Sequence, residues 1–442
     1  MALTTIKTGA IADDAVTADK VANAINTSIA TNTAKDLTAL SASNLTSGTV
    51  PDARFPATLP AASAANLTAV PAANITGTLP AISGANLTGI STTPADGSIT
   101  RAKLSDNVKT SVAGRNMIIN GACRISQRLG TSTAIISDTN SNSGNAFVAY
   151  PVDKFVCWAV GGGALTIQQS SDVPTGKGFS HSLMMTAYTT DTDALTQSGT
   201  YYILQQRIEG YNTSRLSMGG TGAKSSTLSF WVKAPTGTYG VHISNSAQNR
   251  VYLKEFTVSA NQTWEYITLT FPGDTTGTWY TDTNSGVQIN WTLAAGSNYQ
   301  GTANQWATSW DSHTSNQFNF MGTVNNLFRL TGIQYEVGTE STEFEHKTIT
   351  QDNVDCQRYF YKHKIVDSIG PYFMQYQSAH KFVHDWFPVE MRNNPSTSVT
   401  YSGGSGHTIY KVCPNHFKAY MASSYNDNGS YRISSASYSA EL

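Results

Sequence analysis

Two polar, glycine-containing segments of the sequence carry several aromatic side chains each. They are GDTTGTWYTDTNSG (273–286) and GSNYQGTANQWATSWDSHT (296–314). A flat aromatic ring can cover the apolar C–H face of a pyranose, while nearby amides, carboxylates and hydroxyls satisfy the hydroxyl groups of the sugar. The sequence therefore predicts a glycan-contacting role for Trp279, Tyr280, Tyr299, Trp306, Trp310 and Asp311. The alternative is that these long loops fold back and bury their rings.

Trp231 and Trp264 have a different setting, because both lie within runs that alternate large and polar residues. Such alternation is typical of strands with one buried face. We expect these two tryptophans to belong to the core.

Four glutamates in the run EVGTESTEFEH (336–346) could supply a carboxylate pair: Glu336, Glu340, Glu343 and Glu345. Glycoside hydrolysis needs two carboxyl groups roughly 5–10 Å apart across a cleft. In this run they are expected to lie along a strand end and a turn, in solvent. The sequence therefore predicts no catalytic residue and no enzyme.

Other chemical motifs are incomplete. GGTGAKSST (219–227) lacks two of the glycines expected around a phosphate loop and runs into a strand pattern, and GGSGH (403–407) lacks the closing glycine of a nucleophile elbow. His380 and His384 have metal-ligand spacing only on a helix, yet their surroundings predict an extended chain. The four cysteines form no CxxC pair. We expect free thiols, no metal and no cofactor.

Composition narrows the class of protein further. Charged residues make up only 13% of the sequence, about half the usual share, and the net charge is −1. No basic block is present, so we expect no nucleic-acid partner. The longest uncharged apolar-leaning run, residues 155–167, is too short and too glycine-rich to span a membrane. No signal-peptide pattern opens the sequence, so we expect a soluble protein made in a reducing cytoplasm.

The segment 37–94 is an uncharged repeat apart from Asp52 and Arg54. ATLPAASAANLTAV (57–70) matches GTLPAISGANLTGI (77–90) at nine of fourteen positions. Large apolar residues recur every few positions among small and polar ones, so a single chain cannot build a core from them. Either the segment is a disordered linker, or three chains wind together and bury a shared column. We favour the shaft, with these trimer-core positions: Ile75, Leu79, Ile82, Leu87 and Ile90.

The sequence divides into four predicted parts. Residues 1–36 contain a short helix with Val21, Ile25 and Ile29 on one narrow stripe, and residues 37–114 form the shaft and a linker. Residues 115–350 hold many short alternating segments separated by turn signals, as in an antiparallel sandwich or jelly roll. Residues 351–442 begin with a short helix or ordered linker and continue as a small β domain.

Several of these segments resemble a known family. IADDAVTADKVANAI with the NLTSGTVP and NLTGI repeats resembles the stem of bacteriophage tail fibres, cyanophage types especially. NMIINGACRISQR, SFWVKA and LTGIQYEVGTESTEFEHKTITQDNVDCQRYFYK resemble a jelly-roll, carbohydrate-binding-module-like domain of phage fibre proteins. FPVEMRNNPS (387–396) is similar to the start of the small β-sandwich that often follows it.

The resemblance implies a homotrimeric virion protein. Its N-terminal segment would join tail or baseplate proteins, and its β domains would face the host. The implied function is attachment to a host surface glycan in a tail fibre assembled in the host cytoplasm. Two alternatives stay open: a head fibre or baseplate decoration protein, and a glycan-degrading tail spike.

The shaft makes a prediction about assembly. Sedimentation of the purified full chain should give a trimer, because the aliphatic side chains of residues 37–94 can leave water only against copies of themselves. A stable monomer that lacks order in residues 37–94 would contradict the shaft.

Overall fold

The structure, a computed structural model, describes residues 114–138, 148–363, 374–376, 380–402, 407–422 and 432–442, together with 25, 27, 28, 30 and 31. The chain divides into two compact units, Met1–Ser91 and Thr92–Leu442. The five described residues of the first unit are helical and exposed, within the segment predicted as a short helix. The predicted shaft and its trimer-core positions lie outside the described residues.

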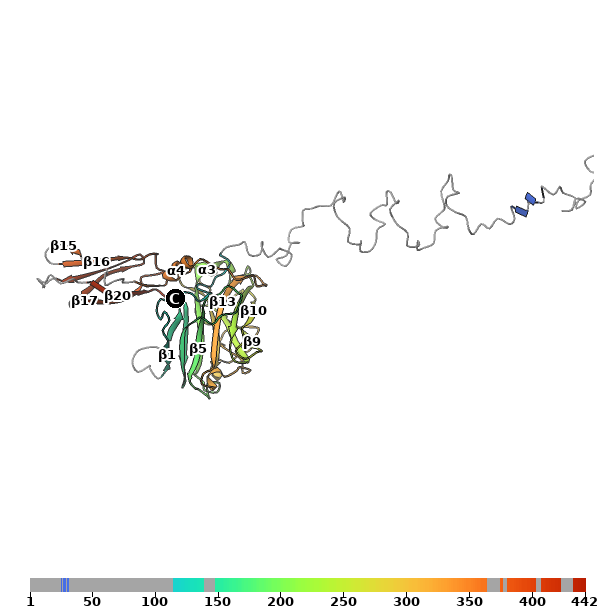
Figure 1. Ribbon diagram of the computed structural model, residues 1–442, viewed down its shortest axis with the longest axis horizontal. Coiled ribbons are helices and arrows are strands. Elements are labelled where there is room, and N and C mark those ends of the chain that lie inside the picture. The colour runs from blue at the N-terminus through green and yellow to red at the C-terminus, as the bar shows by residue number, and fades with distance from the viewer. Residues whose placement is uncertain are drawn as a thin grey trace, which may run out of the picture. The chain divides into compact units, whose positions relative to one another are not determined.

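Antiparallel strands form most of the second unit (Figure 1). One sheet has six strands in the order β1-β4-β5-β13-β7-β10. Their bounds are β1 Ala134–Ser137, β4 Ala164–Ser170, β5 Ser182–Thr189, β13 Leu327–Val337, β7 Ser226–Lys233 and β10 Glu265–Phe271.

A second sheet has seven strands in the order β12-β9-β8-β11-β6-β3-β2. Their bounds are β12 Trp306–Ala307, β9 Val251–Val258, β8 Gly237–Ser244, β11 Ser285–Ala295, β6 Tyr201–Glu209, β3 Phe155–Val160 and β2 Val148–Val152. Short helical turns connect some of these strands: α3 Gly210–Thr213, η10 Ser214–Leu216, η11 Ser297–Tyr299 and η12 Phe320–Gly322.

The inner faces of the two sheets share one hydrophobic core. Leu228, Phe230 and Val232 alternate along β7 and are all fully buried. Phe230 meets Trp291 of β11 edge to face, with ring centroids 5.8 Å apart. Burying each such side chain stabilises the fold by ~1.5–3 kcal/mol. The period of two along the strands therefore yields a sandwich, as the sequence predicts.

The C-terminal part begins with helix α4 (Ile349–Gln357), whose first turn is capped by Thr348. A three-stranded sheet and a four-stranded sheet follow it. Their strands are β14 Phe360–Lys362, β20 Arg432–Ser439 and β17 Ser396–Ser402, then β15 Met374–Tyr376, β16 His380–Trp386, β19 His416–Ala422 and β18 His407–Cys413. Phe417 and Tyr438 pack together between the two sheets, with ring centroids 5.5 Å apart.

The predicted fold class, mainly β with antiparallel sheets in a sandwich, is confirmed. Among the described residues, no helix is long and apolar enough to cross a membrane. All four cysteines are free thiols; three are buried and Cys413 is half-buried.

A buried ionic cluster joins the end of the chain to the sandwich. Glu441 accepts hydrogen bonds from Lys154 Nζ (3.1 Å) and Arg128 Nη2 (3.0 Å). The side chain of Lys154 is only 2% exposed, and its Nζ lies 3.5 Å from the ring centroid of Tyr359. Burial raises the pKa of Glu441, but the charges of Lys154 and Arg128 outweigh it and hold that pKa below its usual value. Glu441 is therefore ionised and compensates two cations.

Glu441→Gln should strongly destabilise the protein, because it leaves the Lys154 ammonium buried without a counter-charge. We expect the free energy of unfolding to fall by ~3–5 kcal/mol in urea denaturation. Glu340→Gln, at an exposed position, should leave it unchanged. A loss for Glu441→Gln no larger than for this control would show that the cluster does not hold the chain end in place.

Candidate functional site

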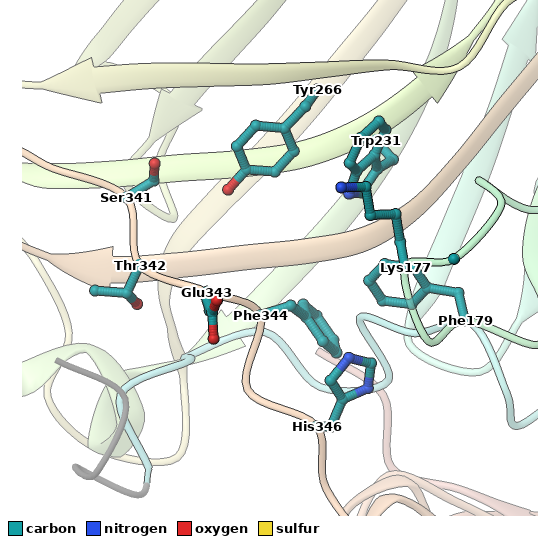
Figure 2. Close-up of a pocket in the computed structure, with 10 residues that line it drawn as sticks. Lys177, Phe179, Trp231, Tyr266, Ser341, Thr342, Glu343, Phe344 and His346 are labelled. Atoms are coloured by element: carbon teal, nitrogen blue, oxygen red, sulfur yellow. The ribbon is translucent and has the colours of Figure 1, made fainter. Parts of the chain in front are cut away.

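The outer face of the six-stranded sheet is hollowed by a cavity of about 600 Å³. Figure 2 shows Trp231 and Tyr266 on neighbouring strands of the sheet, with Ser341, Thr342 and Glu343 on the segment that follows β13. Aromatic side chains thus line a space large enough for a small organic ligand.

Trp231 faces this cavity because its neighbours Phe230 and Val232 face the core. It pairs across the strands with Tyr266 of β10, and the two rings are tilted by 47° with centroids 5.3 Å apart. Tyr266 is 44% exposed. The expectation that Trp231 belongs to the core is wrong: the alternating pattern marks two faces, and Trp231 is on the outer one.

The expectation for Trp264 is also wrong. Trp264 precedes β10 and is half-buried, and its indole Nε1 donates to Asp172 Oδ1 (3.0 Å). Asp172 also pairs with Lys233, at 2.8 Å. A polar partner outside the core holds this ring.

Phe344, Phe179 and His346 form the opposite wall of the cavity (Figure 2). Phe344 meets Phe179 edge to face at 5.0 Å between centroids, and it meets His346 at 4.9 Å. Gly332 lies beneath this wall with φ +61; a Cβ there would lie 2.6 Å from Phe179 and 3.1 Å from Trp231. A glycine is required here both for its left-handed backbone and for the close approach of the rings.

The polar groups of the cavity differ in charge. Lys177 Nζ lies 5.5 Å from the centroid of the Trp231 ring, and Glu343 is exposed at the opening. Ser341 shares a hydrogen bond with Thr268 (3.3 Å). Burial, followed by the charge of Arg124, lowers the pKa of His346, so its ring is neutral at pH 7. The cavity therefore offers aromatic faces together with one cation, one anion and neutral polar groups.

The four candidate carboxylates have separate environments. Glu336 is buried and accepts from the backbone N and the hydroxyl of Thr342, so its expected position in solvent is wrong. Glu345 accepts from the backbone N of Asn116 (2.9 Å), and Glu340 is exposed. Of the four glutamates, only Glu343 lines the cavity.

The aromatic residues predicted from the two polar loops form two clusters. Trp279 meets Trp306 edge to face at 5.8 Å, and both pack against the sandwich core. Tyr299, Trp310 and Tyr201 form the second cluster, with centroids 4.9–5.5 Å apart.

The remaining two predicted residues are placed separately. Tyr280 is 41% exposed. Asp311 accepts from the hydroxyl of Ser309 (2.6 Å). Neither they nor the two aromatic clusters line the 600 Å³ cavity.

Other motifs have structural settings. His380 and His384 both lie on strand β16, and the described residues contain no group of three or more His, Cys, Asp or Glu that could hold a metal ion. The segment GGTGAKSST leads into strand β7 rather than a helix. Ser405 lies outside the described residues.

Comparison with known proteins gives limited information. No protein-family model and no curated protein match the sequence. Solved structures that match in part include the enzymatically active domain of bacteriophage CBA120 tailspike protein 4, at 12% identity and a TM-score of 0.27. That match covers 51% of this chain and 22% of the tailspike chain.

Carbohydrate-binding modules also match in part. One is a CBM4 module, at 14% identity and a TM-score of 0.24, covering 50% of this chain and 98% of the module. Another is a family 11 module from Clostridium thermocellum in complex with a β-1,3-1,4-mixed-linked tetrasaccharide, at 14% identity and a TM-score of 0.25. It covers 43% of this chain and 95% of the module. TM-scores this low do not establish a shared fold, so the fold class rests on the sheets themselves.

His242, beside the second aromatic cluster, makes stability depend on pH. It is fully buried and its Nε2 accepts from the indole of Trp310 (3.2 Å). Burial lowers its pKa from 6.5 to about 3, so below pH 6.5 the unfolded chain binds a proton that the folded chain does not. Folding should lose up to about 1.4 kcal/mol per pH unit from this residue as the pH falls from 6.5 towards 3.

Urea denaturation of wild type and His242→Gln between pH 7 and pH 4 checks this expectation. The stability of the wild type should fall more steeply with acid than that of the variant. Parallel curves would contradict the assignment of a buried neutral imidazole.

Proposed function

We propose that the chain is a structural virion fibre protein that attaches the particle to a host cell by binding a surface glycan in the aromatic cavity. The observation that carries the proposal is the outward-facing pair Trp231 and Tyr266 opposite Phe344 and Phe179, around a cavity of about 600 Å³. The resemblance of the sequence to phage fibre proteins supports the role in the virion.

A sugar ring fits the chemistry of this cavity. Its apolar C–H face stacks on Trp231 or Tyr266, which contributes ~0.5–1.5 kcal/mol per contact beyond buried area. Its hydroxyl groups reach Glu343, Ser341 and Lys177 at the cavity walls. Since Lys177 and Glu343 carry opposite charges, a neutral sugar suits the cavity as a whole.

The predicted trimer would compensate for a weak site. A single shallow cavity binds a sugar weakly, but three linked copies raise the avidity by ~10²–10⁴ without any new contact. The N-terminal segment is the part proposed to join tail or baseplate proteins. A head fibre or baseplate decoration remains the second candidate within the virion, because such a protein needs the same shaft.

We propose binding without catalysis. Glycoside hydrolysis by a carboxyl pair requires a second acid across the cleft, whereas Glu343 is the one acidic residue that lines the cavity. The alternative, a glycan-degrading spike, predicts release of reducing ends from host polysaccharide. Their appearance during incubation with the purified chain would replace the proposal of binding alone.

Trp231→Ala should reduce glycan binding at least about tenfold, because it removes the largest stacking surface of the cavity. The measurement is a glycan array with the full chain, followed by titration of the strongest ligand. Trp231→Phe should retain part of the affinity.

Two matched variants separate the candidate surfaces. Tyr211→Ala removes a tyrosine that is 60% exposed and does not line the cavity, and it should leave binding unchanged. Trp310→Ala tests the second aromatic cluster. If Trp310→Ala abolishes binding while Trp231→Ala does not, the glycan site belongs to the 296–314 loop instead.

A further inference from the structure

The outer face of the seven-stranded sheet carries polar side chains that are buried although they lie outside the sandwich core. Gln288 of β11 is paired in register with Arg207 of β6 on one side and Ser244 of β8 on the other. Asn290, two residues further along β11, is paired with Gln205 and His242. This face therefore differs in chemistry from the aromatic face of the six-stranded sheet.

Hydrogen bonds between amides fix this row. Gln205 Nε2 donates to Gln288 Oε1 (3.0 Å) and to Asn290 Oδ1 (2.8 Å). Gln248 Nε2 also donates to Gln288 Oε1 (3.1 Å). Gln205, Gln288 and Asn290 are each at most 3% exposed. The acceptor oxygens of the row are thus already used by the protein itself.

A cavity of about 270 Å³ opens at one end of the row. Its walls include Arg207, Arg392, Gln248, Gln288 and Ser285, and none of its lining residues is Asp or Glu. Ser285 is 6% exposed, and its buried hydroxyl has no hydrogen-bond partner in the described part of the chain. A buried polar group of this kind costs free energy unless a ligand or water satisfies it.

The two arginines of the cavity hold neutral oxygen atoms of the protein. Arg392 donates to the backbone oxygens of Ala440 (2.8 Å), Thr283 (3.0 Å) and Glu441 (2.8 Å). Arg207 donates through Nε to Gln205 Oε1 (2.8 Å) and through Nη1 to a main-chain oxygen of Leu442 (2.7 Å). Each guanidinium has five N–H groups, so both retain donors that these bonds do not use.

Burial lowers the pKa of Arg207, an effect opposed by Tyr150 and Glu441. The guanidinium nevertheless stays charged, since arginine is not deprotonated in proteins. A second positive charge lies beside it at Arg392. The cavity therefore combines two cations and a free hydroxyl with an excess of hydrogen-bond donors over acceptors.

We propose that this cavity binds an oxyanion group, the carboxylate of an acidic saccharide being the ligand that the site would take. An oxyanion accepts hydrogen bonds without donating any, and it matches the fork of a guanidinium. Ser285 donates to it from the sheet edge, while Arg207 and Arg392 supply the charge. This site is separate from the aromatic cavity and does not depend on the glycan function proposed there.

The test compares two sugars that differ at one group. Glucuronate and glucose are titrated into the full chain by saturation-transfer NMR, and acetate and sulfate are titrated separately. Glucuronate should bind at least about tenfold more tightly than glucose, as expected for charge-assisted hydrogen bonds. Equal binding of the two sugars would overturn the proposal.

Two substitutions locate the site. Ser285→Ala removes a hydroxyl without a protein partner, so it should leave the melting temperature unchanged and weaken glucuronate severalfold. Arg207→Gln should weaken glucuronate about tenfold or more. If Arg207→Gln does not fold, Ser285→Ala carries the test alone, and unchanged glucuronate binding by Ser285→Ala overturns the assignment.

The remaining arms distinguish the sources of the anion. Binding of acetate or sulfate with the same loss in Ser285→Ala supports the oxyanion as the recognised group. Trp231→Ala should leave glucuronate binding intact, whereas it should abolish binding of neutral glycans in the aromatic cavity. Loss of glucuronate binding in Trp231→Ala would place the acidic sugar in the aromatic cavity and overturn a separate site.

Discussion

The contact between Phe230 and Trp291 joins the two sheets, and much of the molecule's surface chemistry depends on it. Phe230 must face Trp291 for the core to close, with ring centroids 5.8 Å apart. Since successive side chains of a strand point to opposite faces, this contact forces Trp231 outward. The largest aromatic surface of β7 is thereby presented to solvent, where Tyr266 and Phe344 complete a cavity. Core packing and the binding surface are two consequences of one strand register.

The two outer faces of the sandwich are suited to different ligands. On the six-stranded sheet, rings from β7 and β10 face Phe344 and Phe179, so stacking is the main interaction available. On the seven-stranded sheet, amides of β6 and β11 are tied to one another and end beside Arg207 and Arg392. An apolar sugar face suits the first surface and an oxyanion suits the second. A chain with net charge −1 can thus recognise opposite chemistries without a strongly charged exterior.

The sequence predicts the class of fold well and the site poorly, for one physical reason. Alternation along β7 identifies a strand with two different faces, but it does not say which of Phe230 and Trp231 meets the core. That choice depends on Trp291, which lies far along the chain. Phe179 and Phe344 come from segments without alternation and reach Trp231 only because Gly332 leaves room for the rings. The loop residues Trp279 and Trp306 were predicted from polar surroundings, yet they find one another and pack against the core.

The central claim is that a glycan stacks on Trp231. Fluorine NMR of the full chain labelled with 5-fluorotryptophan tests it directly, because each of the eight tryptophans gives its own signal. The strongest neutral ligand from the glycan array should shift the resonance assigned to Trp231 and leave that of the buried Trp291 in place. A shift of the Trp279, Trp306 or Trp310 resonances with Trp231 unchanged would contradict the account.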